Sequence, residues 1–281
     1  MSKLELICGR FESISQAQIG PVDLVIADPP DNIVRKYDGV HDDSCSERDY
    51  ARRFKHWLLD CCEITDGPVF WIFNQEWIGE TEHLMREWPG FVALRQRLMW
   101  YWTFGQNNAN RYTPCMRPVY WLGGDYFNSE AVCVPSKRQV IYGDKRAKSG
   151  GRLPDTFWGH GDDYGMLDVL EESRVCGNQI AEGIYERIIR GHLKPGGRVL
   201  DPFIGSGTCA RVCQRLGVDC VGIDVSQNYL DKIGQEMSAH AKMSVKYTTQ
   251  STSEEKRWYS LTMQMERQHR SALCQTKTKK K

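Results

Sequence analysis

Short apolar runs alternate along the chain with segments in which apolar residues recur every three or four positions. The runs predict strands buried on both faces, as in a parallel sheet. They are residues 4–8, 22–27, 69–73, 199–200 and 218–223. The other segments predict helices. They are residues 13–19, 47–63, 81–87, 180–192 and 208–216. Because strands and helices alternate, the sequence predicts one domain of α/β type.

Two further regions predict smaller features. Residues 98–104 are rich in aromatic side chains and predict a strand that returns over residues 118–122 after a polar loop. Near the end of the chain, residues 229–243 predict a helix and residues 244–247 a strand. Residues 250–281 are expected to form a capped helix and a disordered basic tail.

A glycine turn follows the strand that ends at Asp201. Gly205 and Gly207 can take positive φ and let the backbone approach a ligand, while Thr208 begins a helix with unpaired N–H groups. Asp224 ends the next strand, 23 residues after Asp201, where a carboxylate can accept hydrogen bonds from the hydroxyls of a ribose. A plain strand–helix connection also uses glycine, so the turn alone leaves the choice open.

A second stretch contains a rigid elbow. The apolar strand over residues 22–27 runs into Asp28, Pro29 and Pro30. The prolines fix φ and remove two backbone donors, which leaves carbonyl groups facing outward. Such an elbow can bind an amino group.

The two stretches together resemble a known enzyme family. D-P-F-I-G-S-G-T at residues 201–208 resembles the S-adenosylmethionine loop of amino-methylating DNA methyltransferases. V-D-L-V-I-A-D-P-P-D-N-I at residues 22–33 resembles their catalytic D-P-P-Y-N motif. The catalytic motif precedes the cofactor loop, which resembles the β-class order, and the similarity spans residues 4–230.

The resemblance implies an α/β fold with a doubly wound, mostly parallel, Rossmann-like methyltransferase sheet that is circularly permuted. Its catalytic half would be residues 1–122 and its cofactor-binding half residues 154–249. Residues 123–153 would form a small inserted target-recognition region, and residues 250–281 the C-terminal helix and tail. Because the insert is short, the resemblance also allows a homodimer.

The resemblance assigns roles to individual residues. The catalytic motif is Asp28, Pro29, Pro30 and Asp31. Asp28 and the Pro29 carbonyl would each accept one N–H of the target amine. The residues assigned to the S-adenosylmethionine site are Asp201, Phe203, Gly205, Ser206, Gly207, Thr208 and, at the ribose, Asp224.

One position departs from the family pattern. Asp31 stands where the family has an aromatic residue that stacks on the flipped base. We expect that it cannot stack and that it repels Asp28. Tyr37 or an aromatic of residues 100–104 would then supply the stacking face. The alternatives are a weak or inactive nucleic-acid-binding relative, or another substrate such as RNA.

The aspartate that opens the motif favours adenine N6 over cytosine N4 in the resembled family, and N4 remains the alternative. The resemblance implies that two groups of residues contact double-stranded DNA. The loop group, which corresponds to the lining of the family's target-base pocket, is Asn107, Asn108 and Arg111. The basic group, within residues 135–152 where Asp144 is the one acid, is Lys137, Arg138, Lys145, Arg146, Lys148 and Arg152. Trp100 and Trp102 are expected to lie in the hairpin core.

Composition narrows the class of protein. The net charge is only +1, so DNA contacts must come from local patches. No apolar run approaches the ~20 residues of a membrane span and no signal pattern opens the chain, so we expect a cytoplasmic protein that binds no membrane. The resemblance implies a prokaryotic or phage-encoded protein. Eleven cysteines without a C-x-x-C pair predict buried reduced thiols and no metal.

Overall fold

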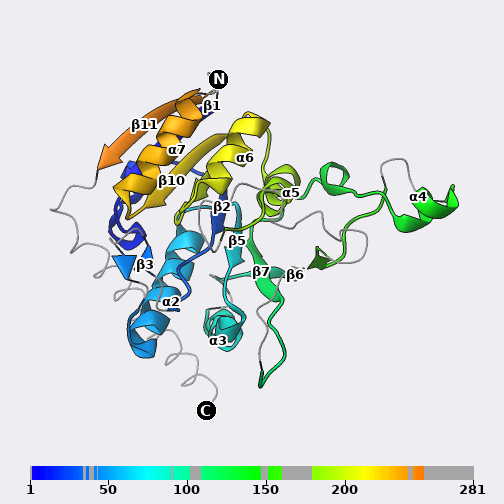
Figure 1. Ribbon diagram of the computed structural model, residues 1–281, viewed down its shortest axis with the longest axis horizontal. Coiled ribbons are helices and arrows are strands. Elements are labelled where there is room, and N and C mark those ends of the chain that lie inside the picture. The colour runs from blue at the N-terminus through cyan, green and yellow to red at the C-terminus, as the bar shows by residue number, and fades with distance from the viewer. Residues whose placement is uncertain are drawn as a thin grey trace, which may run out of the picture.

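The computed structural model describes residues 2–33, 36–37, 41–42, 44–88, 90, 92–101, 109–146, 151–159, 179–239 and 243–249. Their centre is a nine-stranded sheet in the order β11-β1-β10-β9-β2-β5-β7-β6-β8 (Figure 1). The pairs from β11 to β5 are parallel, and β7 is antiparallel to both β5 and β6. The prediction of a doubly wound, mostly parallel α/β fold is confirmed.

The strands of this sheet are short, and their bounds follow in chain order. They are β1 Ser2–Cys8, β2 Leu24–Ala27, β5 Pro68–Ile72, β6 Leu94–Tyr101, β7 Met116–Gly123, β8 Phe157–Trp158, β9 Arg198–Asp201, β10 Asp219–Asp224 and β11 Met243–Thr249. A separate two-stranded sheet pairs β3 Lys36–Tyr37 with β4 His41–Asp42.

Helices cover both faces of the large sheet, because each face carries its own apolar core. One core contains buried residues of α5 Glu182–His192, α6 Thr208–Leu216 and α7 Gln227–Ala239. The other contains residues of η1 Phe11–Ser13, α1 Gln16–Ile19, α2 Glu47–Glu63 and α3 Ile78–Glu87. The remaining described helices are η2 Gln75–Trp77, η3 Glu130–Val132 and α4 Lys137–Tyr142.

The middle of the sheet contains a topological switch point. β9 and β2 are parallel neighbours. From β9 the chain passes through α6 to β10, toward one edge of the sheet, and from β2 it passes through α2 to β5, toward the other edge. Since α6 and α2 lie on opposite faces, a crevice opens beyond the carboxyl ends of β9 and β2. The elbow and the glycine turn both begin there.

Most predicted elements are confirmed, and two differ in an instructive way. The helices predicted over residues 47–63 and 208–216 have those bounds in the structure. The predicted helix over residues 13–19 is shorter in the structure, where α1 spans Gln16–Ile19. Ile14 is extended and separates α1 from η1. β6 begins at Leu94, before the predicted residue 98. The apolar pattern missed this start because the first half of the strand is exposed and carries charged side chains.

The segment between β7 and β8 forms an arm. Figure 1 shows α4 at its end, far from the sheet. The base of the arm is closed by two hydrogen bonds between Val134 and Arg152, each 2.9 Å from N to O. This is consistent with the inserted region predicted over residues 123–153, although the division into domains stays a prediction. Residues 250–281 lie outside the described part of the chain.

No helix in the described part of the chain is both long enough and apolar enough to cross a bilayer. Trp100 is buried in the core as predicted, whereas Trp102 lies outside the described residues. The predicted strand over residues 244–247 is extended by its parallel pairing with β1 and spans Met243–Thr249.

Candidate active site

A cavity of about 970 Å³, its open mouth included, lies at the switch point. Residues of both motifs line it. They are Asp28, Pro29, Pro30 and Asp31 of the elbow, with Phe203, Gly205, Ser206, Thr208 and Asp224 of the cofactor-binding half. The two motifs, far apart in sequence, therefore face one space.

The elbow after β2 is held in place on several sides. Pro29 and Pro30 restrict φ, and the hydroxyl of Tyr50 on α2 donates to the carbonyl of Pro30. Asn32, with φ of 58°, accepts from the backbone N–H of Cys45 at 2.9 Å and donates to its carbonyl at 3.2 Å. These contacts fix the elbow before any ligand binds.

Two acceptors on the elbow remain available. Neither Asp28 Oδ2 nor the Pro29 carbonyl accepts a hydrogen bond from any described residue. Both residues line the cavity. A group with two N–H donors therefore meets two unused acceptors at this wall.

Arg117 of β7 lies between the two carboxylates of the elbow. Its Nη2 donates to Asp28 Oδ1 at 2.6 Å and to Asp31 Oδ1 at 2.8 Å, and its Nη1 donates to Asp31 Oδ2 at 3.0 Å. The expected repulsion is present, since Asp31 raises the pKa of Asp28, but Arg117 pairs with both carboxylates and offsets it. The two like charges share a counter-charge from a residue that lies 86 positions beyond Asp31.

The protonation of Asp28 is tuned by its surroundings. Burial raises its pKa to about 7, while Arg117 acts to lower it and Asp31 to raise it. A carboxyl group with such a pKa can accept a proton near neutral pH.

Asp201 supports the glycine loop from behind. It is fully buried, and it is not one of the described residues that line the cavity. Its Oδ1 accepts from the backbone N–H of Phe203 at 3.0 Å, and its Oδ2 from the hydroxyl of Tyr185 at 3.4 Å. Burial raises the pKa of Asp201 well above its usual range. Direct contact between Asp201 and a cofactor stays a prediction.

Asp224 connects the end of β10 to the loop and lines the cavity. Its Oδ2 accepts from the N–H of Gly205 at 3.0 Å and its Oδ1 from the N–H of Ser226 at 2.8 Å. Asp224 therefore holds the loop and belongs to the cavity wall at the same time.

The two loop glycines have the predicted positive φ, 48° for Gly205 and 83° for Gly207. Their roles differ. Gly205 lines the cavity, whereas a Cβ on Gly207 would lie 2.7 Å from Cγ1 of Ile233 on α7. Gly207 must be small because α7 packs against it, and its contact with a ligand stays a prediction.

None of the described residues that are predicted to contact DNA lines this cavity. Arg111, Arg138, Lys145 and Arg146 are exposed. On the arm, Asp144 pairs with Arg146 at 2.7 Å and with Arg138 at 3.6 Å, and Arg152 pairs with Asp155 at 2.9 Å. Three predicted residues, Asn107, Asn108 and Lys148, lie outside the described residues, as do the side chains of Tyr37 and Lys137.

Several cavity residues were not predicted from the sequence. Trp57 packs edge-on against Phe203, with ring centroids 5.3 Å apart, and donates its Nε1–H to Glu12 at 2.9 Å. Tyr185 and Arg117 also line the wall. Trp57 and Tyr185 fall on the apolar face of helices, where they resemble core residues. Arg117 had one available signal, a basic residue inside an apolar strand.

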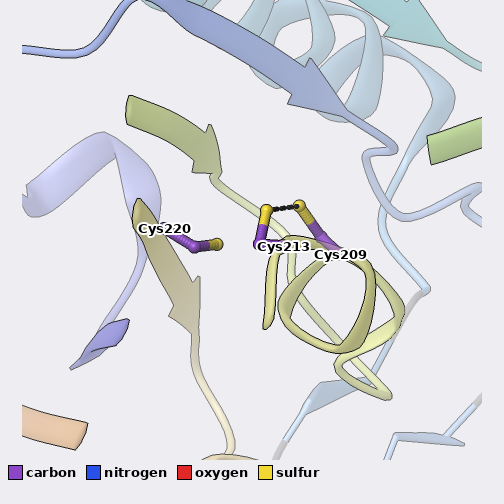
Figure 2. Close-up of side chains that lie close together, drawn as sticks. All are labelled: Cys209, Cys213 and Cys220. Carbon is purple, nitrogen blue, oxygen red and sulfur yellow. Dashed lines mark hydrogen bonds between the residues drawn. The ribbon is translucent and has the colours of Figure 1, made fainter. Parts of the chain in front are cut away.

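The described residues also bring three thiols together. The Sγ atoms of Cys209, Cys213 and Cys220 all lie within 4.8 Å of one another (Figure 2). Cys209 and Cys213 belong to α6 and Cys220 to β10, and all three side chains are buried in the same apolar core. Three thiolates around a divalent ion would place net negative charge in this apolar core, which is costly. We interpret the cluster as packed thiols, and the expectation of no metal stays a prediction.

Comparison with known proteins agrees with this geometry. The family model described as DNA methylase, for N6 and N4 methyltransferases, matches residues 22–236. The type II methyltransferase M.HpaI of Haemophilus parainfluenzae is 25% identical over 242 residues, which cover 83% of this chain and 74% of the relative. The DNA adenine methyltransferase YhdJ of Escherichia coli strain K12 is 26% identical over 227 residues, 74% of each chain.

Among solved structures, that of the M1.HpyAVI–SAM complex is similar, with a TM-score of 0.55 and 16% sequence identity. The match covers 83% of this chain and 99% of that one, which indicates a shared fold. The family match includes both motifs and spans well over half of the sequence. The chain therefore belongs to the DNA methylase family.

Proposed function

We propose that this protein methylates DNA by moving the methyl group of S-adenosylmethionine to the exocyclic N6 amine of an adenine that has left the duplex. The observation that carries the proposal is the pair of unused acceptors, Asp28 Oδ2 and the Pro29 carbonyl, on the wall of a cavity that the glycine loop also lines. An exocyclic amine has two N–H donors, which match these two acceptors in number.

The acceptors address the central difficulty of the reaction. The lone pair of an exocyclic amine is delocalised into the base ring, so the amine is a poor nucleophile. Two acceptors that draw its N–H groups out of the ring plane return the lone pair to nitrogen. Because the elbow is fixed in advance, this stabilisation needs little reorganisation during the reaction.

The residues of the other half of the cavity fit S-adenosylmethionine. The Asp224 carboxylate suits the ribose hydroxyls, and Phe203, packed between Phe11 and Trp57, offers an apolar surface for the adenine. The hydroxyls of Ser206 and Thr208 stand at the start of α6, where charged methionine groups can be bound. When bound, the cofactor supplies a methyl group on a positively charged sulfur.

Asp28 accepts the proton that the amine loses during the reaction. As the new N–C bond forms and the C–S bond breaks, the amine must lose one proton. Asp28 Oδ2, already hydrogen-bonded to that N–H, accepts it, and the raised pKa of Asp28, about 7 because of burial, suits this role. The carboxyl group returns the proton to solvent after the product leaves.

Adenine is favoured over cytosine because an aspartate opens the motif, as in the adenine enzymes that the sequence resembles. Cytosine N4 is the second candidate, since the same two acceptors would bind its amine equally well.

The exposed basic residues of the arm, Arg138, Lys145 and Arg146, support phosphate contacts with double-stranded DNA. The target base must leave the duplex to reach a cavity of this kind, at a cost of a few kcal/mol. A second subunit would extend the short arm, so a homodimer in the cytoplasm completes the proposal.

The test is methyl transfer from isotopically labelled S-adenosylmethionine to unmethylated genomic DNA, followed by nucleoside digestion and mass spectrometry. N6-methyladenine is the expected product. N4-methylcytosine would keep the mechanism and replace the substrate. Cofactor binding without a product on DNA would contradict the proposal and favour a non-catalytic binding protein, and a product on RNA alone would replace DNA as the substrate.

A further inference from the structure

A second buried carboxylate, Asp31, lies beside Asp28, and the catalytic motif does not explain it. Asp31 is only 6% exposed, and its carboxylate is directed to Arg117. Arg117 is itself largely enclosed, with 13% of its side chain exposed. Two carboxylates and one guanidinium thus form a buried cluster with a net charge of −1 at the wall of the cavity.

The guanidinium divides its hydrogen bonds unequally. Asp31 receives both Nη groups, one on each oxygen, whereas Asp28 receives Nη2 on Oδ1 alone. The remaining donor, Nε, is buried and has no acceptor among the described residues. Asp31 therefore binds both Nη groups of Arg117, and Oδ2 of Asp28 accepts no hydrogen bond from the described residues.

This division matters because arginine and carboxylate groups readily form two parallel hydrogen bonds. Without Asp31, the same guanidinium could bind both oxygens of Asp28. Asp28 would then lose the acceptor that the target amine needs. Without Arg117, two buried carboxylates would face each other without a counter-ion, which is costly.

We infer that Arg117 and Asp31 form a positioning pair, in which Arg117 fixes Asp28 through Oδ1 and Asp31 keeps Arg117 away from Oδ2. The inference rests on the proposed function, because it assigns Oδ2 to the substrate amine. It gives the aspartate at position 31 a purpose that a stacking residue could not serve.

The pair makes a directional prediction for pH dependence. Asp28 must be ionised to accept a proton, so the transfer rate rises as the pH increases through the pKa of Asp28. The charged and titratable groups around it are Arg117 on β7, Asp31 on the elbow, Asp201 on β9 and Tyr185 on α5. Removing the like charge of Asp31 lowers the pKa of Asp28, and removing Arg117 raises it.

The decisive variant is Asp31→Asn, which keeps the size of the side chain. Its single-turnover rate at the alkaline plateau should fall about tenfold, because Arg117 then binds Oδ2. The acid limb of the rate profile should move down by about one pH unit. The affinity for S-adenosylmethionine should not change. An unmoved acid limb or an unchanged plateau rate would overturn the inference.

Arg117→Met should move the acid limb in the opposite direction, to higher pH, with a larger loss of rate. If that variant fails to fold, Asp31→Asn alone decides the inference. The matched control is Arg97→Met on the neighbouring strand β6, which removes an arginine paired with Glu82 at 2.6 Å outside the cavity and should leave the profile unchanged.

A readout independent of catalysis separates this inference from the proposed function. The Asp28 carboxyl can be titrated by ¹³C NMR in the full-length chain, with Asp28→Asn used to assign the signal. Opposite shifts of its pKa in Asp31→Asn and Arg117→Met support the pair even if no methylated DNA is found. Unshifted titration in both variants refutes the pair even if the wild-type protein methylates DNA.

Discussion

The glycine loop after β9 and the elbow after β2 are neighbours at one cavity, but they are stabilised in different ways. The loop is held within one strand–helix–strand unit, since Gly205 takes positive φ and donates its N–H to the side chain of Asp224, 19 positions later. The carboxylates of the elbow share a charged side chain from a distant strand, Arg117, which lies 86 positions beyond Asp31. The contact that holds the loop is therefore short in sequence, and the contact at the elbow is long.

The difference predicts a separation of function that mutation can test. Asp28→Asn should reduce methyl transfer by on the order of 10³-fold, because an amide cannot accept the proton of the amine. Cofactor affinity should stay within about twofold, because Asp28 belongs to the elbow. Single-turnover rates and calorimetric titration with the cofactor measure the two effects. A variant that retains at least about one tenth of the wild-type rate would contradict the role of Asp28.

The converse change addresses the loop. Asp224→Ala should weaken cofactor binding by roughly 10- to 100-fold, because it removes the ribose acceptor and the latch on Gly205. At saturating cofactor, the transfer rate should largely recover. The control is Asp219→Ala at the opposite end of β10, where Asp219 accepts from the N–H of Lys3 at 2.8 Å. Equal losses of affinity in both variants would refute the assignment.

These two regions also show how much the sequence could predict. The order of strands and helices follows from local patterns, because apolar periodicity acts over a few residues, and both motifs follow from the resemblance to a known family. Arg117 could not be predicted as the partner of Asp31, because the contact depends on the order of the strands in the sheet. Only β5 separates β7, which carries Arg117, from β2, which leads into the elbow. The packing of Gly207 against Ile233 of α7 was hidden for the same reason.

A pair of glycines at the two ends of α6 tests that packing. Gly207→Ala should destabilise the fold by about 2–3 kcal/mol, because it combines positive φ with a clash against Ile233. Gly217→Ala has a similar φ of 70° but open space around it, and should cost about 1 kcal/mol. Urea unfolding of both variants gives the comparison. If both cost the same, the contact with α7 is not what requires glycine.

The smallest loss of stability is expected at the cluster of Cys209, Cys213 and Cys220. Cys213→Ala should cost about 1 kcal/mol, as for a small change in core volume, and should leave cofactor affinity unchanged. The purified protein should contain no zinc or copper in proportion to the chain, which elemental analysis checks. A stoichiometric metal that Cys213→Ala loses would contradict the interpretation of the cluster as packed thiols.

The central claim is that the loop and the elbow bring a methyl donor and an amine acceptor to one point. A crystal structure of the protein with S-adenosylmethionine tests it most directly. We expect the ribose at Asp224 and the transferable methyl group directed toward Oδ2 of Asp28. A cofactor bound elsewhere, or one whose methyl group points away from the elbow, would contradict the account.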